Sequence, residues 1–164
     1  AYYWPYYRVR DCGAVVPPAE QTAMGLGVAG AIGAALARPD WYAVCTTGDG
    51  AFQMAMHELP TAVEHRLRIT WVIFDDRALG WPRWTQRTAL GGRVIATEFE
   101  ATFDFAAVAR SAGCYAERVE RPEELAPALE RARRANDAGQ PAVIDVAVDI
   151  DEHHPSFVEF HQLR

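Results

Sequence analysis

Two acidic sites in this sequence have the composition and spacing to act together on a cation. Asp49 stands between two glycines in Cys-Thr-Thr-Gly-Asp-Gly (45–50), and the pair Asp75-Asp76 follows after 24 further residues (51–74). Carboxylate oxygens suit Mg²⁺, a hard cation that often completes its coordination shell with phosphate. The alternative is two unrelated turns, in which glycine tolerates positive φ and aspartate caps a helix.

The residues between these acids predict the elements that position them. Apolar runs at 42–47 and 69–74 are typical of buried strands, and the segment 52–66 between them is amphipathic, with Pro60 breaking or kinking its helix. This βαβ arrangement would place both acids at carboxyl ends of neighbouring parallel strands, where open α/β sheets bind ligands. The helix, predicted to begin at Ala51, would offer its first N–H groups to a phosphate.

The rest of the pattern extends this unit into one α/β domain. Further helices are predicted over 20–38, 79–86, 103–113 and 121–137, and further strands over 114–119 and 141–149. Strands that alternate with helices predict a parallel sheet flanked by helices on both faces, which is a three-layer α/β fold. We expect an irregular segment at 1–18, the domain at 19–150 and a polar tail at 151–164.

Composition argues against several classes of protein. The chain has 164 residues, 50% of them hydrophobic, and a formal charge of −6, which predicts one globular domain without the basic surface of a nucleic-acid binder. No apolar run approaches the roughly 20 residues that span a bilayer, and the first residues lack the apolar region of a signal peptide. The three cysteines have no C-x-x-C spacing. We therefore expect a cytoplasmic protein that binds neither nucleic acid nor membrane.

Two further motifs are interpreted as structural. The stretch Gly-Leu-Gly-Val-Ala-Gly (25–30) matches the dinucleotide-binding fingerprint literally, but that fingerprint needs a strand running directly into its first glycine. Two prolines shortly before it exclude such a strand, so we assign these glycines to a closely packed helix. His153, His154 and His161 have no spacing that imposes a metal geometry. We interpret them as part of a solvated tail that docks on a partner.

The stretch GDGAFQMAMHELPTAVEHRLRITWVIFDD, from Gly48 to Asp76, resembles the thiamine diphosphate (ThDP) motif, in which Gly-Asp-Gly is followed some two dozen residues later by two asparagines. Together with the flanking AMGLGVAGAIGAALARP and RVERPEELAPALERA, it makes the chain similar, from about Tyr6 to Asp149, to the C-terminal pyrophosphate-binding domain of acetolactate synthase-like decarboxylases and carboligases. The resemblance implies ThDP and Mg²⁺ as cofactors and a 2-oxo acid as substrate. It also implies the ThDP-binding fold, here without its first strand.

The resemblance implies roles for individual residues. Asp49, Asp76 and the backbone carbonyl of Ala78 would bind Mg²⁺. Met24 would hold the cofactor in a bent conformation, and the carbonyl of Thr22 would accept a hydrogen bond from its aminopyrimidine. These last two residues are the ones expected to act in catalysis, because the bend brings the aminopyrimidine against the reactive carbon of the thiazolium ring.

The resemblance implies further contacts in the same two turns. The other cofactor-binding positions are Gly48, Gly50, Ala51, Leu79 and Gly80, and the substrate mouth would be lined by Trp81, Pro82, Arg83 and Trp84. The alternative for the mouth is a helix packed on the sheet with Arg83 in solvent. Asp76 stands where relatives have asparagine. Pro82 stands where pyruvate decarboxylase-type enzymes have a proton-handling glutamate, which favours carboligation.

The resemblance also implies that this chain would not form a complete active site. The family keeps the glutamate that activates the aminopyrimidine on a pyrimidine-binding domain. That domain would be supplied by a partner subunit in a hetero-oligomer or by N-terminal domains of a longer polypeptide. One alternative is the β subunit of a sulfopyruvate- or phosphonopyruvate-type decarboxylase, and another is a non-catalytic scaffold that kept the fold.

Overall fold

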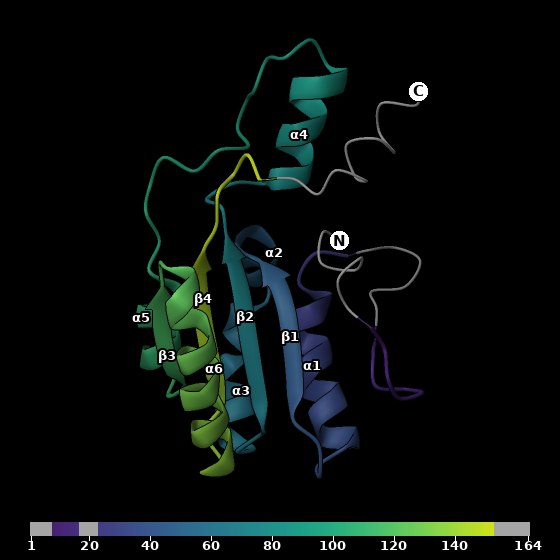
Figure 1. Ribbon diagram of the computed structural model, residues 1–164, viewed down its shortest axis with the longest axis vertical. Helices are drawn as coiled ribbons and strands as arrows, with labels where there is room; N and C mark the ends of the chain where they lie inside the picture. The colour runs from purple at the N-terminus through teal and green to yellow at the C-terminus, as the bar shows by residue number, and fades with distance from the viewer. Residues whose placement is uncertain (1–7, 17–22, 153–164) are drawn as a thin grey trace. The chain divides into compact units, whose positions relative to one another are not determined.

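The computed structural model describes residues 8–16 and 23–152. It divides into two units, Ala23–Ile150 and a second one made of Ala1–Thr22 and Asp151–Arg164. All of the helices and strands in the described residues belong to the first unit (Figure 1). The tail histidines and Thr22 lie outside the described residues.

Four strands form one sheet in the order β1-β2-β4-β3, and every pairing is parallel. They are β1 (Ala43–Gly48), β2 (Ile69–Asp75), β3 (Tyr115–Val119) and β4 (Ala142–Ala147). The predicted parallel sheet is therefore confirmed. In the register of the first pair, Gly48 lies opposite Phe74. The next residues, Asp49 and Asp75, consequently lie side by side at the carboxyl ends of two adjacent strands.

Helices cover both faces of the sheet, and one more helix lies beyond its carboxyl edge (Figure 1). One face is covered by α1 (Leu26–Ala37), α2 (Asp49–Gln53), the 3-10 helix η2 (Met56–Glu58), α3 (Leu59–Glu64) and α5 (Phe105–Ser111). The opposite face is covered by α6 (Pro122–Asp137) over β3 and β4. The helix α4 (Gly80–Ala89) follows the turn at the end of β2.

The larger hydrophobic core lies between the sheet and α1, α2, α3 and α5. Trp71 of β2 is fully buried in it, and its indole nitrogen donates to the carbonyl of Val28 at 3.3 Å. Phe52 and Phe105 meet edge to face, with ring centroids 5.7 Å apart. This core joins the short helix that follows β1 to the helix that precedes β3, so it fixes the backbone around the carboxyl edge.

Gly27 lets α1 approach β1 closely, as predicted for the glycines of the stretch 25–30, whereas a Cβ atom on Gly30 would meet nothing within 4 Å. A Cβ atom on Gly27 would lie 3.1 Å from the sulfur of Cys45. Gly25 has φ of 89° and precedes the first helical residue, Leu26. The predicted helix start at residue 20 was therefore too early, because the left-handed backbone at Gly25 cannot belong to a right-handed helix.

The segment 52–66 is broken into three short helical pieces, which is one of the two outcomes predicted for it. The chain becomes helical at Asp49 rather than at the predicted Ala51. Pro60 occupies one of the first positions of α3. A proline is tolerated there because the first N–H groups of a helix have no intrahelical acceptor. The interruptions therefore lie before Pro60, and Pro60 itself stands in the first turn of α3.

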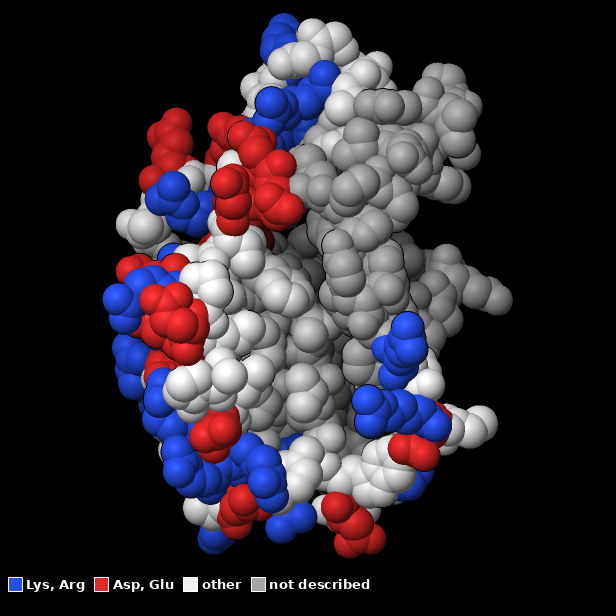
Figure 2. Space-filling model, in the orientation of Figure 1, with Lys and Arg blue, Asp and Glu red and all other residues white. Residues whose placement is uncertain are grey.

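The exposed side of α6 carries charges of both signs (Figure 2). Arg131 donates to both carboxylate oxygens of Glu117 on β3, at 3.1 and 2.8 Å, and Arg133 lies 3.8 Å from Asp137. Ion pairs on an exposed helix face contribute little to stability. The attachment of α6 must therefore come from its buried side.

Asn136 provides that attachment between α6 and β2. The side chain is buried and accepts a hydrogen bond from the hydroxyl of Thr70 at 3.0 Å. Its amide nitrogen donates to the carbonyls of Ile69 and Gln140, both at 3.0 Å. We expect Asn136→Ala to lower the free energy of unfolding by about 2–4 kcal/mol, because buried polar groups would lose their partners.

Urea denaturation would measure this loss. Glu130→Ala, an exposed position on the same helix, is the matched control and should change the free energy of unfolding by less than about 0.5 kcal/mol. Equal effects of the two substitutions would show that Asn136 does not fasten the helix.

Candidate functional site

The turn after β1 buries one carboxylate and leaves one of its oxygens without a partner. Gly48 is extended (φ −80°, ψ 160°), and the chain turns into α2 at Asp49, which is 2% exposed. Oδ1 of Asp49 accepts the N–H of Gly50 at 2.7 Å. Oδ2 is buried and has no hydrogen-bond partner within the described part of the chain. A buried carboxylate oxygen in this state is suited to bind a cation.

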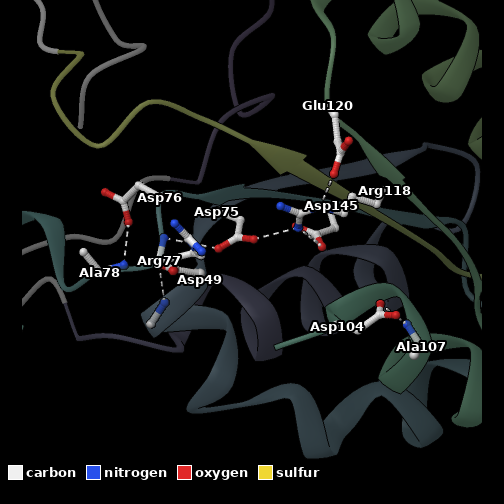
Figure 3. Close-up of polar contacts among 11 residues, drawn as sticks. Asp49, Asp75, Asp76, Arg77, Ala78, Asp104, Ala107, Arg118, Glu120 and Asp145 are labelled. Atoms are coloured by element: carbon white, nitrogen blue, oxygen red, sulfur yellow. Dashed lines mark hydrogen bonds and ion pairs between the residues drawn. The ribbon is translucent and has the colours of Figure 1, made fainter. Parts of the chain in front are cut away.

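The turn after β2 presents Asp76 at the same edge of the sheet. Arg77 has φ of 55°, an uncommon conformation for a residue other than glycine that marks a constrained turn. Its N–H donates to Oδ1 of Asp75 at 3.3 Å, and the N–H of Ala78 donates to Oδ1 of Asp76 at 3.0 Å (Figure 3). Each aspartate is thus oriented by the backbone two residues further along.

The backbone around Ala78 is held in place while its carbonyl lacks the usual helical donor. The N–H of Leu79 donates to the carbonyl of Thr97, and that of Phe99 donates to the carbonyl of Arg77, each at 2.8 Å. The first helical bond of α4 runs from the N–H of Arg83 to the carbonyl of the N-cap Leu79 at 2.9 Å, so the carbonyl of Ala78 lies just outside the helix. The Ala78 carbonyl therefore fits the predicted role of a third metal ligand.

The electrostatics of the edge favour a cation. The pKa of Asp49 is raised to about 7, mainly by burial; the backbone hydrogen bond from Gly50 opposes the shift, and the charges of Asp76 and Asp75 add to it. Burial likewise raises the pKa of Asp76, with Asp75 adding to the effect. Both shifts mean that negative charge at this edge is poorly compensated. A divalent cation between the two carboxylates would relieve that cost.

The described residues do not by themselves complete a metal coordination shell. Within residues 8–16 and 23–152, no three His, Cys, Asp or Glu side chains gather into a metal site. The predicted set has only two carboxylates and one backbone carbonyl. Mg²⁺ usually keeps several waters and binds proteins together with substrate phosphates, so this set suits a Mg²⁺–phosphate group better than a bare ion.

Glycines bring three separated segments together above this edge. A Cβ atom on Gly50 would lie 2.6 Å from Cδ2 of Leu79 and 3.5 Å from Cε of Met24. Met24 precedes α1 and is 44% exposed. The structure therefore places three of the sequence-predicted cofactor residues, which are far apart in the chain, against one another.

Helix α4 divides the residues predicted for the substrate mouth. Trp81 and Pro82 are exposed, whereas Arg83 and Trp84 are buried. The Nε of Arg83 lies 2.6 Å from Oε1 of Glu98. The alternative that left Arg83 in solvent is therefore wrong, because this ion pair holds the guanidinium against the strand-like segment around residue 98. Contact with a substrate stays a prediction for all four residues.

A cavity of about 180 Å³ lies beside the carboxylates and was not predicted. Its polar wall and its aromatic wall come from different elements, and its lining consists of Asp49, Gln53, Asp75, Arg77, Phe99, Ala101, Phe103 and Phe105. The aromatic side chains come from the segment that leads into α5, which no motif singled out. Asp49 and Asp75 both line this cavity although they are only 2% and 5% exposed.

Sequence reasoning also missed an ion-pair network next to the site, in which the partly exposed Arg118 meets two buried carboxylates. Nη1 of Arg118 donates to Oδ2 of Asp75 at 2.7 Å and to Oδ2 of Asp145 at 2.8 Å (Figure 3). The available signal was Asp145 itself, an acid in the middle of an apolar strand. Burial raises the pKa of Asp145 to about 6, although Arg118 opposes the shift.

Gly80 provides a test of whether the position of Asp76 matters for cation binding. A Cβ atom at residue 80 would lie 2.7 Å from Oδ2 of Asp76, so Gly80→Ala must displace that carboxylate. We expect the substitution to weaken Mn²⁺ binding, measured by electron paramagnetic resonance with Mn²⁺ as a probe for Mg²⁺, by about tenfold or more.

Gly33→Ala is the matched control, because a Cβ atom there meets nothing within 4 Å. It should leave Mn²⁺ binding unchanged and raise the free energy of unfolding by about 0.5–1 kcal/mol, since Gly33 lies inside α1. Native Mn²⁺ affinity in Gly80→Ala would argue against Asp76 as a ligand.

Comparison with known proteins agrees with this geometry. The family model described as thiamine pyrophosphate enzyme, C-terminal TPP binding domain, matches residues 1–146. The chain is 38% identical over 126 residues to the "Probable acetolactate synthase large subunit" of Methanococcus aeolicus, a match that covers 77% of this chain and 20% of the relative. It is 36% identical over 132 residues to the acetolactate synthase large subunit of Corynebacterium glutamicum, covering 78% of this chain and 21% of the relative.

A solved structure, the thiamine diphosphate-dependent 4-hydroxybenzoylformate decarboxylase of Rhodococcus jostii RHA1, matches with a TM-score of 0.71 and 25% identity. That match covers 79% of this chain and 24% of the decarboxylase. The chain thus spans about a fifth to a quarter of the length of these proteins. Because the family model matches nearly all of it, the chain belongs to the thiamine pyrophosphate enzymes, as their C-terminal TPP-binding domain.

Proposed function

We propose that this chain binds the diphosphate of ThDP through Mg²⁺, as part of an acetolactate synthase-like enzyme that decarboxylates a 2-oxo acid and acts as a carboligase. The observation that carries the proposal is the buried Oδ2 of Asp49, which has no partner within the described residues, at the sheet edge that also holds Asp76. Membership of the TPP enzyme family supports ThDP as the cofactor.

In this proposal the two turns hold the cation and the cation holds the diphosphate. Asp49, Asp76 and the carbonyl of Ala78 provide three oxygen ligands, which leaves further positions for phosphate and water. Ala51 stands in the first turn of α2, where N–H groups lack intrahelical acceptors and can donate to phosphate. The N–H of Gly50 already donates to Asp49, so it orients the metal ligand first.

Residues before α1 and in the second turn would support the organic part of the cofactor. Met24 and Leu79 lie against Gly50 and offer an apolar surface at the diphosphate end, where Met24 would maintain the bend. Thr22 would supply its carbonyl, and Gly48 and Gly80 would allow the backbone to come close. When bound, ThDP itself supplies the electron sink for decarboxylation.

The type of reaction is inferred from the start of α4. Pro82 is exposed there and cannot exchange a proton, whereas the resemblance places a glutamate at this position in pyruvate decarboxylase-type enzymes. We therefore favour carboligation over release of a simple aldehyde. Trp81 is exposed beside it, so together they would border the acceptor substrate.

We further propose that a pyrimidine-binding domain completes the site, on a partner subunit in a hetero-oligomer or elsewhere in a longer polypeptide. The small share of each relative that this chain spans supports this view, since it covers 20% to 24% of them. Within its described residues, no helix combines the length and apolar character needed to cross a bilayer. Together with the unpaired cysteines at 12, 45 and 114, this is in keeping with our proposal of a cytoplasmic location.

The first test removes the metal ligands in the assembled enzyme. Asp49→Ala should abolish Mg²⁺-dependent ThDP binding, measured by calorimetry, without unfolding the domain, because the carboxylate serves the cation and not the core. Asp76→Asn should keep ThDP affinity within about tenfold of the native value, since an amide oxygen can still bind Mg²⁺. Asp40→Ala, which removes an exposed carboxylate, is the control for charge, and unchanged affinity in Asp49→Ala would refute the metal site.

The second test concerns the need for a partner. The 164-residue chain with Mg²⁺ and ThDP should bind the cofactor weakly or not at all and should turn over neither pyruvate nor other 2-oxo acids. Addition of a pyrimidine-binding chain, or use of a longer polypeptide that contains both domains, should restore turnover. Substantial turnover by the chain alone would contradict the divided site.

A further inference from the structure

The order of the strands brings an arginine from β3 to acids on two other strands. Arg118 lies opposite Asp145 of β4 in the sheet register, and Asp145 lies opposite Ile73 of β2. Asp75 is two residues after Ile73, so its side chain points to the same face of the sheet. The three charged side chains therefore form one row across the carboxyl edge.

One nitrogen of this arginine holds both carboxylates. Nη1 lies 2.7 Å from Oδ2 of Asp75 and 2.8 Å from Oδ2 of Asp145, whose side chains are 4% and 0% exposed. Nε lies 3.3 Å from Glu120, which directs the guanidinium plane. The guanidinium holds both buried carboxylates strongly, because loss of its positive charge would leave two buried negative charges uncompensated.

Asp75 transmits this constraint to the adjacent turn. Its other oxygen, Oδ1, accepts the N–H of Arg77 at 3.3 Å, and Arg77 is the residue with left-handed φ. The next N–H, from Ala78, donates to Oδ1 of Asp76. A continuous series of hydrogen bonds thus runs from Arg118 through Asp75 and this turn to the side chain of Asp76 (Figure 3).

We propose that Arg118 is a positioning residue for the cation site, an inference that rests on the proposed function. Arg118 holds Oδ2 of Asp75, which lines the same cavity as Asp49, and so fixes the turn that aims Asp76 and the Ala78 carbonyl. Asp49 and Asp76 are then the carboxylates offered to the metal, while Asp75 and Asp145 each give one oxygen to the guanidinium. Residues that orient metal ligands from outside the coordination shell commonly change metal affinity 10- to 100-fold when replaced.

The sign of the effect separates this role from simple electrostatics. Arg118→Met removes a positive charge close to the cation site, so Coulomb attraction alone would make Mn²⁺ bind more tightly. Loss of positioning should instead weaken the Asp49-dependent binding of Mn²⁺ to the full chain by about tenfold or more. Arg118→Lys keeps a charge that can bridge the two acids and should stay within about threefold of the native affinity.

A double substitution keeps the net charge of the native chain and protects the fold. In Arg118→Met with Asp145→Asn, one buried carboxylate is neutralised along with the loss of the guanidinium. Mn²⁺ binding should still be weakened about tenfold, because Asp75 remains unheld. Arg131→Met is the matched control. It breaks the two hydrogen bonds between Arg131 of α6 and Glu117, which lies on β3 next to Arg118, and it should leave Mn²⁺ affinity unchanged.

Electron paramagnetic resonance of free Mn²⁺ would give all of these affinities, with circular dichroism to establish that each variant is folded. Native or tighter Mn²⁺ binding in a folded Arg118→Met chain, or native affinity in the double variant, would overturn the positioning role of Arg118 but not the proposed metal site. Mn²⁺ binding to the native chain that is unaffected by Asp49→Ala would overturn the proposed metal site and this inference with it.

Discussion

Negative charge concentrated at the carboxyl edge of a parallel sheet is the constraint around which this domain is arranged. Parallel pairing directs the ends of β1, β2 and β4 to one side. Asp49 follows β1, Asp75 ends β2, and Asp145 lies two residues before the end of β4. Burial makes the charged forms costly, as the raised pKa values of Asp49, Asp76 and Asp145 indicate. Such an arrangement is stable only with cations at defined positions, and Arg118 is one of them.

The elements around this edge leave room beside the carboxylates. A side chain at Gly50 would meet Leu79 and one at Gly80 would meet Asp76, so the glycines of the two turns keep this space free. The bridge between Ala78 and Glu98 fixes the second turn from outside. The aromatic contact between Phe52 and Phe105 fixes α2, which follows β1, against α5. Rigid support of this kind suits the proposed binding of a diphosphate.

Much of the fold followed from local pattern. Apolar runs of strand length and amphipathic segments of helix length predicted all four strands and most helices to within a few residues. The position of the breaks before Pro60 and the helix start at Asp49 were not predicted, because short helices gain most of their stability from tertiary contacts rather than from propensity. The helix start at Leu26 depended on one backbone angle at Gly25.

The sequence by itself determined which carboxylates could meet, because βαβ connectivity requires Asp49 and Asp76 to lie at the same edge. It also identified the family, through a motif whose spacing reflects that connectivity. Only the tertiary structure decided which groups compensate these charges. Arg118 is 43 residues from Asp75 and 27 from Asp145 in the chain, and they meet because β4 inserts between β2 and β3. Hydrophobic periodicity specifies the faces of strands but not their order, so this network could not be read from the sequence.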